Sequence, residues 1–277
     1  MTPELSRRIV SGLVMAVVVL GVTWTGGLPF RMLAAAISLL VYYEWSKIAS
    51  LNERNFTGNM IGWVGIILLS ANIAFGNPDM SMPLLGGLAI TVALGIALRG
   101  GTWWLPGGVV YAGLSGISLA AIRDGGAMGL AAVLFVFAVV WSTDILAYFV
   151  GKSLKGPKLA PRISPGKTWS GAIGGTISAI VAGSLLTFAI FGRVSAWIIM
   201  LALVLSVASQ IGDLFESFIK RRFGVKDSSH LIPGHGGVMD RVDGLVFACF
   251  AVFLLTLVYG SLAGHVGISV AGFLFGV

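Results

Sequence analysis

Four aspartates stand where long apolar stretches meet charged segments, and these are the residues most able to do chemistry. Asp144 follows an apolar run that includes Phe135, Asp213 follows 19 uncharged residues, and Asp240 and Asp243 precede the last long apolar run. An ionised carboxylate at such depth costs roughly 2.5–3.5 kcal/mol unless a cation or a water-filled cavity meets it. For any single aspartate, a structural role as a protonated or arginine-paired group stays open.

Helical spacing brings several polar residues onto common faces. One stripe at i, i+3, i+6 and i+7 consists of Gln210, Asp213, Glu216 and Ser217. Asp240 and Asp243 are three residues apart, and Asp144 and Tyr148 are four apart. Carboxylates gathered beside basic residues at a membrane boundary indicate hard cations and a polyanionic substrate. Mg²⁺ fits, because one or two carboxylates and substrate phosphates commonly bind it.

The segment 217–244 combines cations, glycines and these last aspartates. Its four leading cations are Lys220, Arg221, Arg222 and Lys226. Arginine and lysine bind phosphate oxygens, and glycines such as Gly236 and Gly237 let the backbone approach a ligand closely. His230 and His235 could ligate zinc, but two histidines without neighbouring cysteines favour a hydrogen-bonding or structural role.

A second basic segment, 151–169, precedes another apolar run. Gly166-Lys167-Thr168 is similar to the end of a phosphate-binding P-loop, but that motif requires glycine where this chain has Pro161, and it requires a preceding strand. We therefore reject a P-loop. Lys167 still lies just before an expected helix, whose N-terminus favours phosphate.

Membrane helices must position these segments. Of the 277 residues, 57% are hydrophobic and 10% charged, and the mean hydropathy is +0.96, whereas a soluble domain is about a quarter charged. About 20 apolar residues cross a bilayer. The uncharged runs are 9–30, 55–78, 80–98, 100–122, 125–143, 168–192, 194–212 and 244–277, with a shorter one at 32–43. This composition excludes a soluble enzyme and a secreted disulfide scaffold.

We predict an all-α fold, a polytopic membrane helical bundle with eight or nine transmembrane helices. It forms a single integral membrane domain over 1–277, with scaffold spans mainly in 1–130 and catalytic spans and cytoplasmic loops in 131–262. The many glycines suit close helix packing in lipid.

The placement of lysine and arginine orients the helices. Eight and nine spans both place 151–169 and 220–243 in the cytoplasm, so we expect a bacterial cytoplasmic membrane protein with its active site facing inward. The net charge of +7 follows from this orientation, and we expect no nucleic-acid binding. Five further acids are expected to be solvated in loops or termini, namely Glu4, Glu44, Glu53, Asp79 and Asp124. Cys249 is expected to be a small buried hydrophobe.

The second half of the chain contains a series of short motifs of charged, small and proline residues. They are Ser217, Lys220-Arg221, Lys226-Asp227, Ser229, Ile232-Pro233, His235-Gly236-Gly237, Asp240-Arg241 and Asp243. Upstream stand Asp144-x-x-Ala147-Tyr148, Lys158-Leu159-Ala160-Pro161, Ser164-Pro165-x-Lys167-Thr168-Trp169 and Gln210-x-Gly212-Asp213. This pattern resembles the signature of the phosphatidate cytidylyltransferase (CDP-diglyceride synthetase) family. The N-terminal half resembles the family only in its hydropathy, and Ser170 stands where many members have glutamate.

The resemblance implies a metal-assisted nucleotidyl transfer in phospholipid biosynthesis, in which CTP and phosphatidate give CDP-diacylglycerol and pyrophosphate. We hypothesise that Asp213 and Asp240 hold Mg²⁺, with a second cation left open. Asp144 and Asp243 would be further metal ligands or supports for the ligands. The expected partners are CTP, phosphatidate and membrane lipid, and a homodimer is left open.

The remaining site residues would bind the substrates. Phosphate groups would contact Lys167, Lys220, Arg221 and Lys226, the last also counted with the catalytic aspartates. Ser164, His235, Gly236, Gly237 and Arg241 complete the substrate-binding set.

Other functions stay open at this stage. A related CTP-dependent isoprenoid cytidylyltransferase or lipid kinase is the main alternative. An ion-coupled transporter would place its acids near the membrane midplane, whereas these acids gather at one face. A CDP-alcohol phosphotransferase is disfavoured because its Asp-Gly-x-x-Ala-Arg core is absent.

Overall fold

The computed structural model describes residues 3–232, 234–265 and 267–276, with only the backbone described for residues 3–9. Pro233 of the family signature and the Glu4 side chain lie outside this description. The chain divides into two compact units, Met1–Ala121 with Phe223–Arg241 and Ile122–Arg222 with Val242–Val277. The single domain expected from the sequence stays a prediction.

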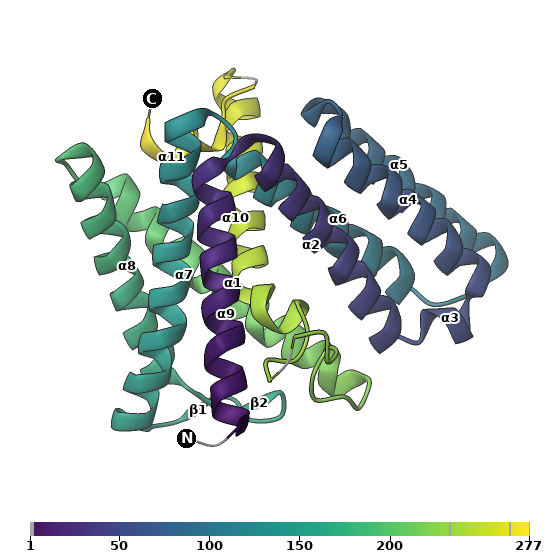
Figure 1. The fold of residues 1–277 in the computed structure, drawn as a ribbon, viewed down its shortest axis with the longest axis horizontal. Coiled ribbons are helices and arrows are strands. Elements are labelled where there is room, and N and C mark those ends of the chain that lie inside the picture. Colours follow the sequence, from purple (N-terminus) through teal and green to yellow (C-terminus); the bar gives the residue numbers. More distant parts are fainter. Residues whose placement is uncertain (1–2, 233, 266, 277) are drawn as a thin grey trace. The chain divides into compact units, whose positions relative to one another are not determined.

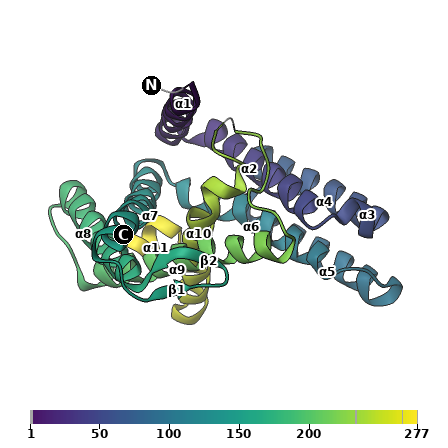
Figure 2. The ribbon, with the colours of Figure 1, turned by 90° about the horizontal axis from the view of Figure 1, so that it is seen from below.

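The first unit is built from antiparallel helices. They are α1 (Pro3–Thr25), α2 (Gly27–Ile48), α3 (Leu51–Arg54), α4 (Phe56–Phe75), the 3₁₀ turn η1 (Pro78–Met80), α5 (Ser81–Arg99) and most of α6 (Trp104–Arg123). α4 packs between α2 and α5 (Figures 1 and 2). Arg31 of α2 donates to the carbonyls of Ile73 and Gly76 at 2.6 Å each. It thereby satisfies carbonyls that the end of α4 leaves without helical partners.

The second unit contains longer helices and a small hairpin. Its elements are α7 (Gly126–Leu154), β1 (Lys158–Ala160), β2 (Ser164–Thr168), α8 (Trp169–Phe191), α9 (Ala196–Arg222), α10 (Met239–Ala263, without its first turn) and α11 (Val270–Phe275). The strands pair antiparallel, with Lys158 opposite Thr168 and Ala160 opposite Ser164. The sequence predicted a loop for this part of segment 151–169, where the structure has a hairpin. The last uncharged run is divided between α10 and α11 after Gly264, whose φ of 71° ends a helix.

α8 packs against α7 through a stripe of small residues. The buried positions of α8 recur every fourth residue, at Gly171, Gly175, Ala179, Gly183 and Thr187. Its exposed face carries the large apolar side chains Ile173, Ile177, Val181, Leu185 and Phe188. Small residues let helix backbones approach closely in lipid, and the large ones remain for the lipid itself. The glycine-rich composition therefore serves helix packing here.

Seven helices within the described residues are long and apolar enough to cross a membrane. They are α4, α5 together with η1, α6, α7, α8, α9 and α10. The apolar part of α1, Val10–Thr25, is shorter. The short run 32–43 extends at both ends into the 22-residue α2, which carries Arg31, Glu44 and Lys47. The chain is an all-α integral membrane protein, as predicted. The predicted total of eight or nine spans would be reached if α1, α2 or both also cross the membrane.

Gly175→Ala is expected to destabilise the second unit. The new Cβ would lie 2.7 Å from the Thr143 carbonyl oxygen and 3.0 Å from the Ala147 Cβ, so α7 and α8 would have to separate. Overpacking of this kind costs about 1–3 kcal/mol, which a lower thermal unfolding midpoint in detergent would report. The control is Gly95→Ala in α5, where nothing lies within 4 Å. Equal midpoints for the two variants would contradict this packing.

Candidate active site

A pocket of about 740 Å³ lies within the second unit, beside the hairpin. Asp144 and Tyr148 of α7, Lys167 and Thr168 of β2, and Asp213 of α9 are among its lining residues. Pockets for small molecules commonly measure ~300–1,000 Å³. The volume suits a nucleotide or a lipid head group, and both the helices and the hairpin of the unit supply its polar groups.

Ion pairing and electrostatic proximity join four of the predicted site residues in this unit. The Lys167 ammonium forms an ion pair with the Asp213 carboxylate. Asp144 and Asp243 lie within electrostatic range of both partners. Three carboxylates therefore lie within electrostatic range of Lys167 and of Asp213 or Asp144, and an opposite charge nearby favours their ionised form.

The backbone of the second unit fixes these acids through close packing and hydrogen bonds. A Cβ on Gly212 would lie 2.5 Å from the Asp243 carbonyl oxygen, so glycine lets α9 approach α10 beside Asp213. Gln210 donates to the Thr176 hydroxyl at 3.0 Å and so ties α9 to α8. Two members of the polar stripe predicted on α9, Gln210 and Asp213, therefore contact neighbouring elements of their own unit.

The pocket also contains three lysines that the sequence analysis did not assign to the site. Lys152, Lys155 and Lys158 line it together with Lys167. The Ser170 hydroxyl donates to the Lys155 carbonyl and so connects the start of α8 to the segment between α7 and the hairpin. The sequence did contain one indication that Lys152 belongs to the site. Lys152 follows Asp144 by eight residues, which places both on the same side of a helix.

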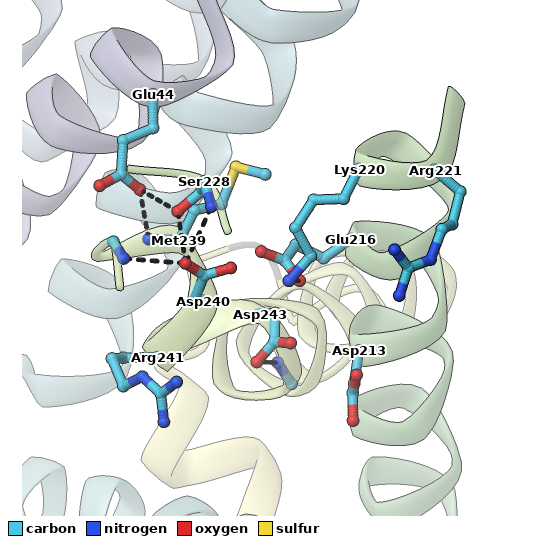
Figure 3. A network of polar contacts seen from close by, with 12 residues as sticks. Glu44, Asp213, Glu216, Lys220, Arg221, Ser228, Met239, Asp240, Arg241 and Asp243 are labelled. Carbon is cyan, nitrogen blue, oxygen red and sulfur yellow. Dashed lines mark hydrogen bonds and ion pairs between the residues drawn. The ribbon is translucent and has the colours of Figure 1, made fainter. Parts of the chain in front are cut away.

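The C-terminal end of α9 carries two more predicted phosphate ligands. Lys220 forms an ion pair with Glu216 at 2.5 Å, and both side chains are largely buried. Arg221 donates to the Ile163 carbonyl at 3.4 Å, at the turn of the hairpin. Figure 3 shows Lys220 and Glu216 directed toward one another.

The signature loop, residues 223–241, belongs to the first unit and is held by an unexpected residue. Glu44 of α2, predicted to be solvated, is fully buried. Its carboxylate accepts hydrogen bonds from the Ser228 and Ser229 hydroxyls and from the Val238 and Met239 amides, at 2.6–3.0 Å. Figure 3 shows the bonds from Ser228 and Met239. The prediction of a solvated Glu44 is wrong because the loop folds back onto α2.

Asp240 is the second acceptor within the signature loop. Its Oδ2 atom accepts from the Ser228 amide and hydroxyl at 2.9 Å each and from the Gly237 amide at 2.8 Å (Figure 3). Gly236 adopts a φ of +83°, which favours glycine. A Cβ on Gly237 would overlap the Ser228 hydroxyl oxygen and Glu44 Oε1. Here the glycines make room for the protein's own carboxylates.

The other predicted residues take separate positions. His235 Nδ1 is 2.9 Å from the Ser11 hydroxyl, and Arg241 Nε donates to the His235 carbonyl at 3.0 Å. Lys226 is exposed, and Ser164 begins β2. Across the described residues no three His, Cys, Asp or Glu side chains lie together as a group that could hold a metal ion.

Comparison with known proteins decides the family. Residues 6–259 match the Cytidylyltransferase family. The chain belongs to this family. A phosphatidate cytidylyltransferase of Brucella abortus is 43% identical over 259 residues, covering 92% of this chain and 94% of that protein. One of Bacillus subtilis is 32% identical over 269 residues, with 92% and 98% covered. One of Rickettsia conorii is 38% identical over 132 residues, with 45% and 57% covered.

Membership in the cytidylyltransferase family confirms the resemblance found in the C-terminal half and extends it. The matched residues include α2, so Glu44 and the signature loop that it contacts both lie within the family region. The N-terminal helices therefore belong to the family fold together with the signature.

Gly237→Ala is expected to displace the signature loop of this cytidylyltransferase. The methyl group would overlap both Ser228 and Glu44, so the loop must leave its present position. Trypsin should then cleave faster after the exposed Lys226 in detergent-solubilised protein. The matched control is Gly87→Ala in α5, which meets nothing within 4 Å. An unchanged cleavage rate for Gly237→Ala would contradict the loop geometry.

Proposed function

We propose that this protein is a phosphatidate cytidylyltransferase, which makes CDP-diacylglycerol and pyrophosphate from CTP and phosphatidate. One observation carries the proposal: relatives of that name share up to 43% identity over almost the whole chain. The pocket of the second unit supports it, because its lysines and carboxylates suit phosphate chemistry.

The reaction joins two phosphate groups. A phosphate oxygen of phosphatidate attacks the α-phosphorus of CTP and forms the new P–O bond. The bond from that phosphorus to the bridging oxygen breaks, and its electron pair leaves with pyrophosphate. Because the phosphate monoester is already an anionic nucleophile, no serine or histidine base is needed. Catalysis then consists mainly of positioning and of charge neutralisation.

The pocket lysines would reduce the repulsion between the two anionic substrates. Lys167 is oriented by its ion pair with Asp213, and Lys152, Lys155 and Lys158 surround the same pocket. A phosphate that enters the pocket would compete with Asp213 for Lys167 and release the carboxylate. The assignment of Lys220, Arg221 and Lys226 to substrate phosphates stays a prediction, as does that of Ser164, His235 and Arg241.

The donor set of the pocket fits a magnesium ion. Asp144 and Asp213 line the pocket and lie within electrostatic range of one another. Two carboxylates with substrate phosphates are a common Mg²⁺ environment, so a three-residue cluster is not required. We propose that these two residues hold Mg²⁺ and that Asp243 supports them. When bound, the ion would neutralise phosphate charge. Asp240 as a ligand and a second cation stay predictions.

The location of the chemistry follows from its substrates. We propose a bacterial cytoplasmic membrane, with the pocket facing the cytoplasm. The relatives are bacterial, CTP is water-soluble, and lysines concentrate on the cytoplasmic side of membrane proteins. The acyl chains of phosphatidate would remain in the bilayer while its phosphate enters the pocket.

Labelled CTP and phosphatidate in mixed micelles test the activity. With Mg²⁺, we expect cytidine label in the lipid fraction and one pyrophosphate for each CDP-diacylglycerol formed. EDTA should stop the reaction, and added Mg²⁺ should restore it. Label that remains entirely water-soluble would reject the proposal. Transfer of the label to an isoprenoid phosphate but not to phosphatidate would favour the related cytidylyltransferase instead.

Asp213→Asn should lower kcat by at least about a hundredfold, a loss typical of removing a group that stabilises transition-state charge. The amide removes the partner of Lys167 and a proposed metal ligand. Initial rates in mixed micelles measure the effect. Asp79→Asn, at an exposed acid of η1, is the control and should retain wild-type turnover. Wild-type kcat in Asp213→Asn would remove Asp213 from the mechanism.

A further inference from the structure

Glu44 connects α2 to the signature loop through both of its carboxylate oxygens. Oε1 accepts from the Ser229 hydroxyl at 2.6 Å and from the Val238 amide at 2.8 Å. Oε2 accepts from the Ser228 hydroxyl at 3.0 Å and from the Met239 amide at 2.6 Å. The side chain is fully buried. Glu44 therefore has no access to a substrate and acts only on its protein partners.

The burial of this carboxylate is compensated by the start of α10. Met239 is the first residue of that helix, and Val238 directly precedes it. Amides at a helix N-terminus have no partner within the helix, and the helix dipole favours a negative charge there. Glu44 thus caps α10 from another helix. Any displacement of the carboxylate would expose buried amides and hydroxyls without acceptors, which is unfavourable.

Ser228 transmits the position of Glu44 to Asp240. Its hydroxyl lies 3.0 Å from Glu44 Oε2 and 2.9 Å from Asp240 Oδ2, and its amide also donates to Asp240. A serine hydroxyl has one proton, so the two carboxylates share a single donor. Gly237 completes the link, because its amide donates to Asp240 and its missing Cβ makes room for Glu44.

We propose that Glu44 is a positioning residue of the transferase, which fixes the signature loop and the first turn of α10 in the conformation that turnover requires. Glu44 would act through Asp240 and its neighbour Arg241, so the inference rests on the proposed function. It assigns a role in the reaction to a residue that the sequence places among scaffold spans.

Glu44→Gln tests the proposal with almost no change in shape. Both oxygens accept a backbone amide, so either orientation of the carboxamide directs its NH₂ group at a backbone N–H. We expect kcat to fall on the order of a hundredfold, as misplacement of catalytic groups by about 1 Å can do. The KM for CTP should change far less. The control is Glu53→Gln, at an exposed acid of α3, which should keep the wild-type kcat.

Two buried serines provide a second test that does not need Glu44→Gln to fold. Ser228 and Ser229 both donate to Glu44, but only the Ser228 hydroxyl also reaches Asp240. Ser228→Ala should therefore lower kcat several-fold more than Ser229→Ala. A purely structural role predicts that each variant loses activity only in proportion to its loss of thermal stability, whereas the proposal predicts an additional loss of kcat for Ser228→Ala.

Each rate should be expressed per monodisperse, folded protein, with thermal unfolding measured in the same detergent. A wild-type kcat for Glu44→Gln, or equal losses from the two serine variants, would overturn the proposal. An inactive wild-type protein in the CTP and phosphatidate assay would instead refute the proposed function. The loop geometry would still be testable through trypsin cleavage after Lys226 in Glu44→Gln.

Discussion

A carboxylate removed from water must be met by hydrogen-bond donors or cations, and that requirement organises the polar parts of this protein. Glu44 is met by four donors of the signature loop. The buried Glu216 is met by Lys220, and the half-buried Asp213 is met by Lys167. An isolated buried charge would cost far more than any of these contacts returns. The contacts of Glu44 and Asp213 therefore specify which loop or strand meets a helix, whereas Glu216 and Lys220 pair within α9.

The sequence predicted the helices and part of the site because both leave local patterns. Uncharged runs mark spans, and the spacing of Gln210 and Asp213 marks a helix face. The hairpin was missed because its strands have three and five residues and include Pro165 and Gly166, which give no strand alternation. Glu44 was missed because an acid near a helix end has the same sequence context whether water or a distant loop covers it. Its partners are at least 184 residues away.

Glycine shows the same limit in another form. The sequence suggested that Gly236 and Gly237 allow a ligand to approach the backbone. In the folded loop, Asp240 approaches Gly236, while Ser228 and Glu44 occupy the space beside Gly237. On α8, Gly171 and Gly175 instead admit the backbone of α7. A glycine in the sequence indicates that some group packs closely against the backbone at that position. Only the folded structure identifies that group.

The contact between Glu44 and the signature loop also constrains biogenesis. Because 184 residues separate Glu44 from Ser228, translation at ~5–20 residues per second leaves α2 waiting about 10–40 s for these donors. During that interval the Glu44 carboxylate has none of its four donors. It must be hydrated, protonated or bound by an insertion factor. Capture of the acid by the newly made loop is therefore among the last steps of maturation, and a ribosome stalled after α9 would hold an inserted but immature chain.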